Sequence, residues 1–180
     1  MKFKNKDIWT SDMKEKVNKA WLLTGGNLGD RNENLSRART WIGKECGKII
    51  HASPVYETSA WGKTDQPAYF NQALAIETRL SAKQLMQVVL KIEKKMGRIR
   101  TEKYGPRLID IDILFFNDEI HNTPSLVIPH PALPGRKFVL VPLADIAPNY
   151  IHPLMKRTVT KLLQECTDPG HVNKINTGTC

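Results

Sequence analysis

The sequence predicts one α+β domain, a sandwich of a sheet and packed helices rather than a doubly wound parallel sheet. First, segments with strand character and segments with helical periodicity alternate irregularly along the chain. Second, 180 residues suffice for one domain with a sizeable core, because a domain of ~150 residues buries about two-thirds of its unfolded surface. Third, 41% hydrophobic and 25% charged residues, with a mean hydropathy of -0.39, are typical of a soluble globular protein.

The first half of the chain predicts one helix among three strands. A short apolar run at 20–24, stopped by two glycines, has the character of a buried strand. Asp30 begins a capping-box pattern that predicts a helix continuing through Ile42. Two further strands are expected at 48–57, which contains a proline and therefore lies near an edge or a bulge, and at 69–77.

The second half begins with the longest predicted helix. Ser81 starts a capping box, and an apolar stripe at helical spacing follows it. The β-branched and aromatic content of 108–116 predicts a strand. We expect 117–136, with its four prolines, to be loop, and we expect helices at 138–146 and 158–166.

The ends of the chain differ from its middle. We expect residues 1–19 to form a polar N-terminal extension, residues 20–167 the folded domain, and residues 168–180 a C-terminal tail. No stretch approaches the ~20 apolar residues of a membrane helix, and the N-terminus lacks the apolar segment of a secretory signal. Three widely spaced cysteines without metal-binding spacing are typical of a reducing compartment, so a cytoplasmic location is expected.

The net charge predicts an anionic partner. It is +9, from 27 Lys and Arg against 18 Asp and Glu, and both nucleic acid and a polyphosphate nucleotide fit it. Residues 91–107 concentrate this charge, with seven basic side chains against two acidic ones. Glycines and a proline interrupt the helical period there, so we expect the arginines to lie on a loop rather than on a solvated helix face.

Two aspartates in one strand are the sharpest chemical signal. Side chains alternate along a strand, so Asp110 and Asp112 are expected to share a face, about 6.5–7 Å apart. The opposite face is expected to carry Ile111, Ile113 and Phe115, while Leu114 and Phe116 would follow the aspartates. Two carboxylates beside apolar residues are energetically costly unless positive charge offers them compensation. Divalent metal would supply it, since Mg²⁺ prefers one or two carboxylates together with substrate phosphates.

Arginines around the strand supply the matching positive groups. Arg98, Arg100 and Arg107 can each bind phosphate oxygens at two points and stay charged at any working pH. The alternative is that both aspartates simply pair with Arg98 and Arg107. Metal, carboxylates and guanidinium groups together would suit phosphoryl-type transfer, in which positioning and electrostatics do most of the work.

Two further groups suggest ligand contacts. In a proline-rich loop, His130 is followed within eight residues by Arg136 and Phe138, which makes this histidine a candidate phosphate contact. Tyr69 and Asn71, with the loop 58–62, could bind a flat heteroaromatic ring, because an aromatic side chain stacks on its face and an amide pairs with its polar edge. An ordinary strand end is the alternative for this last group.

These groups of candidate site residues, in their order along the chain, resemble the 6-hydroxymethyl-7,8-dihydropterin pyrophosphokinase family of folate biosynthesis. The resemblance extends from about Trp21 to about Pro153. The most specific segments resemble the family's GRxR and GPRxxDxDIL signature and are Gly97-Arg98-Ile99-Arg100 and Gly105-Pro106-Arg107-Leu108-Ile109-Asp110-Ile111-Asp112-Ile113-Leu114. Other matching segments are Gly25-Gly26-Asn27-Leu28-Gly29-Asp30, Tyr56-Glu57-Thr58, Gln66-Pro67 with Phe70-Asn71, and Pro129-His130 with Arg136 and Phe138.

The resemblance implies a ferredoxin-like α+β sandwich, with a mainly antiparallel sheet, helices packed on it and long active-site loops. It implies transfer of diphosphate from ATP, the co-substrate, to the hydroxymethyl group of a reduced pterin, with release of AMP. The implied catalytic residues are Arg98, Arg107, Asp110 and Asp112, of which Asp110 and Asp112 would hold two Mg²⁺ ions. The implied ATP contacts are Arg98, Arg100, Tyr104, Arg107, Ile113, Leu126, His130 and Arg136, with Ile113 and Leu126 at the adenine. The implied pterin contacts are Thr58, Trp61, Tyr69, Asn71 and Phe138.

Two other functions remain as alternatives. A basic nucleic-acid-binding module would explain the pI of about 9.5 but not the aspartate pair. A metal-dependent phosphohydrolase would use the same carboxylates. Under the pyrophosphokinase interpretation we expect ATP and the hydroxymethyl dihydropterin as substrates, no nucleic-acid or membrane partner, and a monomer.

Overall fold

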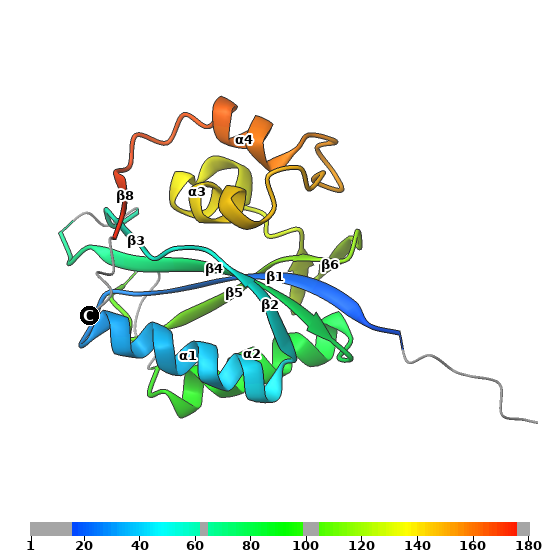
Figure 1. Ribbon diagram of the computed structural model, residues 1–180, viewed down its shortest axis with the longest axis horizontal. Helices are drawn as coiled ribbons and strands as arrows, with labels where there is room; N and C mark the ends of the chain where they lie inside the picture. The colour runs from blue at the N-terminus through cyan, green and yellow to red at the C-terminus, as the bar shows by residue number, and fades with distance from the viewer. Residues whose placement is uncertain (1–15, 62–64, 99–104, 176–180) are drawn as a thin grey trace, which may run out of the picture.

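A computed structural model describes residues 16–61, 65–98 and 105–175, which form a sheet with helices on both of its faces (Figure 1). The strands are β1 (Asn18–Gly26), β2 (Lys48–Ala52), β3 (Tyr56–Thr58), β4 (Tyr69–Thr78), β5 (Asp110–Phe116), β6 (His121–Thr123), β7 (Leu126–Ile128) and β8 (Val172–Lys174). The helices are α1 (Arg31–Glu45), α2 (Ala82–Lys95), α3 (Lys137–Ile146), α4 (Val159–Glu165) and the 3-10 turn η1 (Leu133–Gly135).

The main sheet has the order β5-β1-β4-β3-β8, and β2 also pairs with β4. Within the described residues every pairing between strands is antiparallel, which confirms the expected mainly antiparallel sheet. β1 and β4 form the centre, and their register runs from Asn18 opposite Thr78 to Gly26 opposite Phe70. β5 is an edge strand, so one side of its backbone is open to partners from outside the sheet.

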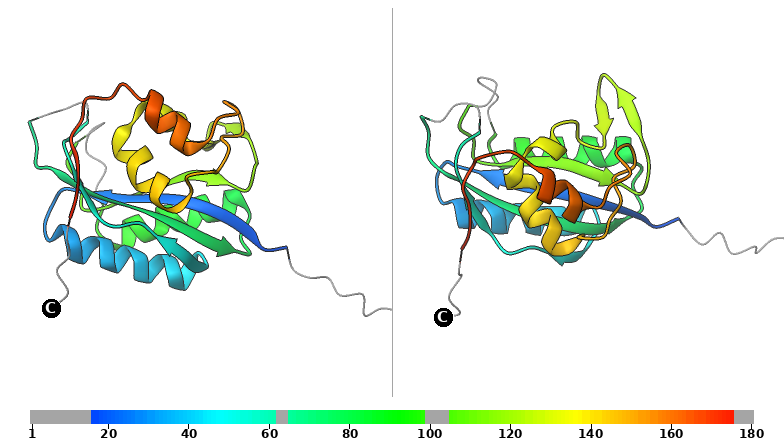
Figure 2. Two further views of the ribbon diagram at one scale, coloured as in Figure 1. Left: turned by 45° about the horizontal axis from the view of Figure 1, so that its top comes forward. Right: turned by 90° about the horizontal axis from the view of Figure 1, so that it is seen from above.

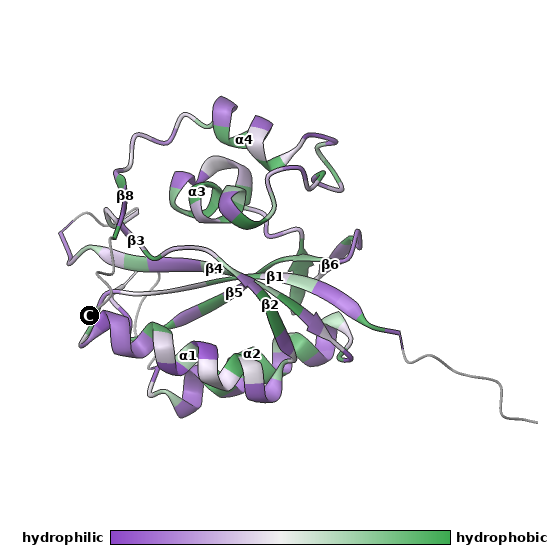
Figure 3. Ribbon diagram, in the orientation of Figure 1, coloured by the Kyte–Doolittle hydropathy of each residue, from purple (hydrophilic) through white to green (hydrophobic). Residues whose placement is uncertain are grey.

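Each face of the sheet has its own core. α1 and α2 cover one face, and α3 and α4 cover the other (Figures 1, 2 and 3). The first core includes Leu22, Ile42, Leu74, Leu85, Ile92 and Ile113. The second core includes Leu23, Ala73, Leu114, Phe115, Leu140 and Leu162. Neighbouring residues of β1 and β4 point into different cores, as the alternation of side chains along a strand requires.

The predicted helices form where the capping patterns placed them. The Asp30 carboxylate accepts the Glu33 backbone N–H at the start of α1 (2.9 Å). Ser81 and Gln84 cap one another at the start of α2, so the predicted capping box is confirmed. α3 continues through Pro142, as expected. In the part of the chain described, no helix is long and apolar enough to cross a membrane.

The prediction of a single strand at 48–57 is wrong, because this segment forms two strands, β2 and β3. The break lies at Ser53 and Pro54. The hydroxyl of Ser53 accepts the backbone N–H of Ala73 in β4 (3.0 Å) and donates to the carbonyl of Pro54 (2.7 Å). Proline has no N–H for a sheet pairing, so a side-chain hydrogen bond replaces part of the backbone ladder here.

A β-bulge changes the faces expected for β5. Trp21 and Leu22 are consecutive in β1, yet they lie opposite Phe115 and Ile113, which leaves Leu114 as an extra residue. Leu114 and Phe115 therefore both enter the second core, and the residue after them enters the first. The faces predicted for the two phenylalanines of this strand are wrong, because a bulge shifts the alternation by one residue.

Two segments contain more regular structure than the sequence indicated. The region 117–136, predicted as loop, contains the β6–β7 hairpin and η1. β1 begins at Asn18, inside the segment assigned to an N-terminal extension. β8 lies inside the segment assigned to a C-terminal tail and pairs with β3, with Val172 opposite Thr58.

Candidate functional site

A cavity of about 400 Å³ is lined by residues of α2, on one face of the sheet, and by residues at the start of α3, on the other face. Residues from β1, β3, β4 and β5 also line it. The sequence-predicted site residues that line this cavity are Thr58, Trp61, Tyr69, Asn71, Arg98, Arg107, Asp110, Asp112, His130, Arg136 and Phe138. Segments far apart in the sequence therefore meet at one place.

Four predicted residues are not among the residues that line the cavity. Arg100 and Tyr104 lie outside the described residues. Ile113 and Leu126 are described, and both are buried in the first core, on the sheet face opposite the aspartates. Their predicted contact with an adenine base stays a prediction.

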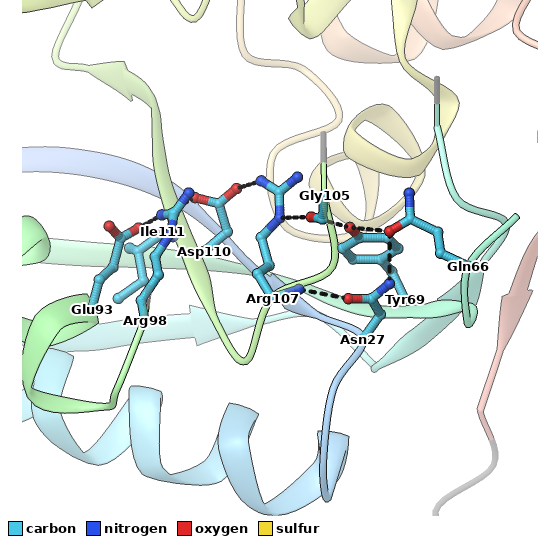
Figure 4. Close-up of polar contacts among 9 residues, drawn as sticks. All are labelled: Asn27, Gln66, Tyr69, Glu93, Arg98, Gly105, Arg107, Asp110 and Ile111. Atoms are coloured by element: carbon cyan, nitrogen blue, oxygen red, sulfur yellow. Dashed lines mark hydrogen bonds and ion pairs between the residues drawn. The ribbon is translucent and has the colours of Figure 1, made fainter. Parts of the chain in front are cut away.

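Charged side chains occupy one half of the cavity, and we call Glu93, Arg98, Arg107, Asp110 and Asp112 the charged cluster. Asp110 pairs with two arginines at once: Oδ1 accepts from Arg98 (2.5 Å), and Oδ2 accepts from Arg107 (Figure 4). Burial alone would raise the pKa of Asp110, but the two guanidinium groups outweigh it and hold this pKa below its usual range. Asp110 is therefore a stable carboxylate.

Glu93 joins the charged cluster from α2, across the edge of the sheet. Its carboxylate accepts the backbone N–H of Ile111, on the open side of edge strand β5 (2.8 Å), and pairs with Arg98 (Figure 4). Only 3% of Glu93 is exposed. Burial raises its pKa to about 7, while Arg98 opposes and Asp110 adds to this shift.

Sequence analysis missed Glu93, although a signal was present. Glu93 lies four residues after Val89 and three before Met96, and both are buried apolar residues of the α2 stripe. An acidic residue in an apolar stripe is costly unless a partner compensates it.

Among the carboxylates of the charged cluster, Asp112 is the one whose negative charge is least compensated by the positive groups of the described residues. It shares a sheet face with Asp110, as predicted, but makes no ion pair with any described residue. The pKa of Asp112 is raised to about 7, mainly by burial and also by the negative charges of Asp110 and Glu93. The positive charges of Arg136 and Arg98 oppose this shift. The alternative in which both aspartates pair with arginines therefore holds only for Asp110.

This arrangement fits a divalent cation bound partly by groups from outside the protein. Asp110 and Asp112 offer carboxylate oxygens, and Asp112 makes no ion pair with a described residue. Across the described ranges there is no group of three or more His, Cys, Asp or Glu side chains that could hold a metal ion. Mg²⁺ suits such a site, because it prefers one or two carboxylates together with phosphates and water.

Arg136 and His130 lie between the charged cluster and the aromatic side of the cavity. The Arg136 guanidinium lies 4.4 Å from the Trp61 ring centroid and 5.7 Å from that of Phe138. Its Nε–H is buried and has no hydrogen-bond partner among the described residues, so it can donate to a ligand. Burial and the Arg136 charge lower the pKa of His130, while the charge of Asp110 acts to raise it. The His130 Nδ1 atom accepts the Ala132 N–H (3.3 Å).

The other half of the cavity is the aromatic pocket, which we define as Thr58, Trp61, Tyr69, Asn71 and Phe138. Asn71 donates from Nδ2 to the Thr58 hydroxyl at 2.8 Å, which fixes the direction of its amide. A Cβ at Gly25 would lie 2.2 Å from the Asn71 Oδ1 atom, so glycine is needed for this close approach. Flat aromatic faces beside an oriented amide suit a heteroaromatic ring.

Asn27 connects the two halves through backbone and side-chain contacts. Its Oδ1 accepts the Arg107 N–H (2.8 Å), and its Nδ2 donates to the Gln66 side chain (3.1 Å) (Figure 4). The Tyr69 hydroxyl also donates to Gln66 or to the carbonyl of Gly105, each at 3.2 Å. The loops after β1, before β4 and before β5 thus support one another.

Comparisons with known proteins agree on one family. The family model for 7,8-dihydro-6-hydroxymethylpterin-pyrophosphokinase (HPPK) matches residues 21–148. A protein of Methylorubrum extorquens called 2-amino-4-hydroxy-6-hydroxymethyldihydropteridine pyrophosphokinase is 37% identical over 160 residues, which are 88% of this chain and 99% of that protein. A protein of the same name from Aquifex aeolicus is 39% identical over 147 residues, 82% of this chain and 91% of that protein.

Longer relatives contain the same region. The folic acid synthesis protein FOL1 of Dictyostelium discoideum is 38% identical over 158 residues; these are 88% of this chain, which spans 24% of that relative. A crystal structure of Plasmodium falciparum HPPK-DHPS is similar with a TM-score of 0.68 and 22% sequence identity. This similarity covers 86% of this chain and 45% of the other, and it confirms the expected ferredoxin-like α+β fold.

Proposed function

Because the chain belongs to the 7,8-dihydro-6-hydroxymethylpterin-pyrophosphokinase family, we propose that it transfers diphosphate from ATP to 6-hydroxymethyl-7,8-dihydropterin and releases AMP. The observation that carries this proposal is one cavity with two chemically different halves. The charged cluster suits a triphosphate, and the aromatic pocket suits a pterin. The donor and the acceptor of the diphosphate would therefore meet where the two halves join.

The charged cluster supports binding of the triphosphate together with magnesium. Asp110 and Asp112 would hold two Mg²⁺ ions, which would neutralise phosphate charge and polarise the phosphoryl oxygens. Without this compensation a triphosphate would face repulsion from two aspartates. The magnesium complex of ATP is therefore the expected co-substrate.

The arginines of the charged cluster would bind the phosphates directly. Arg98 and Arg107 currently share Asp110, and each can exchange a carboxylate oxygen for a phosphate oxygen. Arg136 offers a buried N–H without a partner, and His130 lines the same region. Arg100 and Tyr104, which lie outside the described residues, are proposed as further ATP contacts.

The aromatic pocket supports binding of the pterin. We place the ring between Tyr69 and Phe138, with the amide of Asn71 at its polar edge and with Thr58 and Trp61 completing the site. The hydrogen bond to Thr58 uses an Asn71 N–H, so the Asn71 Oδ1 atom can accept from the amino group of a pterin.

Positioning would then supply much of the rate. The hydroxymethyl oxygen attacks the β-phosphorus and its hydroxyl proton passes to solvent, the bond from this phosphorus to the oxygen shared with the α-phosphate breaks, and AMP leaves. Holding the attacking oxygen in line can contribute ~7–11 kcal/mol through effective concentration. Arg98, Arg107 and Arg136 would stabilise the charge that develops on the leaving and migrating phosphates. Within the described residues we identify no general base, and we assign little of the rate to one.

The chain would act in folate biosynthesis as a cytoplasmic monomer. Its partners would be the two small-molecule substrates, with no role for nucleic acid or a membrane.

The test is AMP formation from Mg-ATP with and without the hydroxymethyl dihydropterin. We expect AMP only when the pterin is present, in equal amount to the pterin diphosphate formed. Release of AMP or ADP without pterin would instead indicate a phosphohydrolase. Binding of random oligonucleotides in a salt-titrated gel shift, without AMP formation, would indicate a nucleic-acid-binding module.

A further inference from the structure

Helix α3 begins without a capping side chain of its own. Its N-cap residue is Arg136, whose side chain makes no capping hydrogen bond. Ser, Thr, Asp or Asn usually occupies this position, because a short side-chain oxygen accepts a free N–H of the first turn. Arg136 is unsuited to capping, since a guanidinium only donates.

A residue far along the chain supplies the missing acceptor. Asp168 Oδ2 accepts the backbone N–H of Lys137, the first residue of α3, at 2.9 Å and across 31 residues of sequence. A negative charge also interacts favourably with the positive end of a helix dipole. Lys137 stands between Arg136 and Phe138, so this contact fixes the backbone that carries two residues of the proposed site.

The segment that contains Asp168 also contacts the opposite wall of the aromatic pocket. We call residues 168–175 the C-terminal strap. The His171 N–H donates to the Ser59 hydroxyl (2.9 Å), and the Ser59 N–H donates to the His171 carbonyl (3.2 Å). β8, within the strap, continues this contact by pairing with β3. Figure 1 shows the strap descending from α4 to β3, past the start of α3.

Asp168 also fixes the shape of the strap between these two contacts. Its second oxygen, Oδ1, accepts the Gly170 N–H at 2.9 Å. One carboxylate therefore joins the start of α3 to a turn that leads directly to the Ser59 contact. The external cap also leaves the N-cap position free for Arg136, whose guanidinium lies over the Trp61 and Phe138 rings.

We propose that Asp168 is a positioning residue for pterin binding. In this proposal the C-terminal strap sets the distance between two sides of the aromatic pocket, one formed by Ser59 to Trp61 and the other by Phe138. This inference rests on the proposed function. Asp168 itself is not among the residues that line the cavity, so it acts through its contacts with Lys137 and Gly170 and not by touching the substrate.

The test measures the KM of each substrate and the pterin dissociation constant for the wild type, Asp168→Ala and Asp168→Asn. Loss of a helix cap shifts the folding equilibrium of the helix about fivefold. We expect the pterin KM and dissociation constant of Asp168→Ala to rise by a similar factor. The KM for ATP should rise less than the pterin KM, because Arg136 is the one proposed ATP contact of the described residues beside this cap, while Arg98 and Arg107 are held by Asp110. Asp168→Asn keeps one acceptor oxygen, so it can retain the contact to Lys137 while losing the one to Gly170, and it should recover part of the pterin affinity.

Ser81→Ala is the matched control, because it removes the cap of α2 on the opposite face of the sheet. It should lower thermal stability to a similar extent and leave the pterin KM unchanged. If Asp168→Ala binds pterin as tightly as the wild type, or if Ser81→Ala weakens pterin binding equally, the inference is wrong while the proposed function stands. If the wild-type chain binds no pterin, the proposed function fails and the inference fails with it.

Discussion

The charged cluster and the aromatic pocket share one cavity, but different forces hold their side chains. In the charged cluster, Asp110 and Glu93 bind the arginines that a phosphate would need. In the aromatic pocket, neutral hydrogen bonds such as the one from Asn71 to Thr58 orient the side chains, and the Arg136 guanidinium lies over the Trp61 and Phe138 rings. The pocket is therefore organised before its ligand binds, whereas the cluster must exchange ion pairs.

This difference gives separate expectations for the two ligands. Pterin binding should depend on shape and on the support of α3, and it should respond little to metal. Nucleotide binding should depend on charge, and removal of a single carboxylate or of metal should affect it strongly.

The largest effect is expected from Asp112→Asn. Asp112 is a buried carboxylate without an ion pair to a described residue, so its charge is available for a cation. Loss of such an electrostatic group should lower kcat about 10²–10³-fold, while the pterin dissociation constant stays unchanged. Steady-state kinetics and calorimetry measure both. An unchanged Tm would show that folding is intact, and wild-type turnover in this variant would contradict the role of Asp112.

Phe138→Ala should have the next largest effect. Stacking of a base on an aromatic ring contributes ~1–3 kcal/mol, so pterin affinity should fall about tenfold to a hundredfold. The affinity for ATP should change far less, because the charged cluster is unaltered. Titration calorimetry with each ligand separately makes this comparison. Equal losses for both ligands would mean that the two halves of the cavity are not distinct.

Removal of metal by EDTA should separate the two halves without any substitution. The affinity for ATP should fall about tenfold, because a triphosphate then faces uncompensated carboxylates. Pterin affinity should stay within about twofold, because neutral groups supply its contacts. Both affinities come from calorimetry on the same preparation with and without Mg²⁺. Pterin binding that requires Mg²⁺ in the absence of nucleotide would contradict this comparison.

The smallest effect concerns His152, which supports the α3 side of the sheet. His152 is 3% exposed, and its Nδ1 accepts the backbone N–H groups of Leu154 and Met155, both at 3.2 Å. Burial lowers the pKa of His152. The unfolded chain therefore takes up a proton first, and folding stability should fall as pH decreases below the ordinary histidine pKa of ~6.5.

Urea unfolding between pH 5 and pH 8 measures this dependence, with His152→Asn as the comparison. Asn retains an oxygen that can accept the two N–H groups but does not titrate, so its stability should vary less with pH below ~6.5. The same pH dependence in both proteins would contradict the assignment to His152.

Much of the site could be predicted because its signals are local in sequence. The alternation of side chains places Asp110 and Asp112 on one face, and the structure confirms it. The bulge at Leu114 could not be predicted, since the residues that follow are all apolar and fit either face. Glu93 was missed because its role depends on the edge of the sheet, a feature of tertiary structure.

The C-terminal strap shows the same limit of sequence analysis. Val172–Lys174 is too short and too polar to show the pattern of a strand, and it pairs only because β3 offers a free edge. The capping role of Asp168 joins residues 31 positions apart, and no local pattern indicates such a contact.

The most direct test of the account is a crystal structure with Mn²⁺ in place of Mg²⁺, a non-hydrolysable ATP analogue and the hydroxymethyl dihydropterin. We expect anomalous scattering from metal beside both Asp110 and Asp112, with phosphates at Arg98 and Arg107 and the pterin between Tyr69 and Phe138. Both ligands bound with no metal beside Asp112, or the pterin bound outside the aromatic pocket, would contradict it.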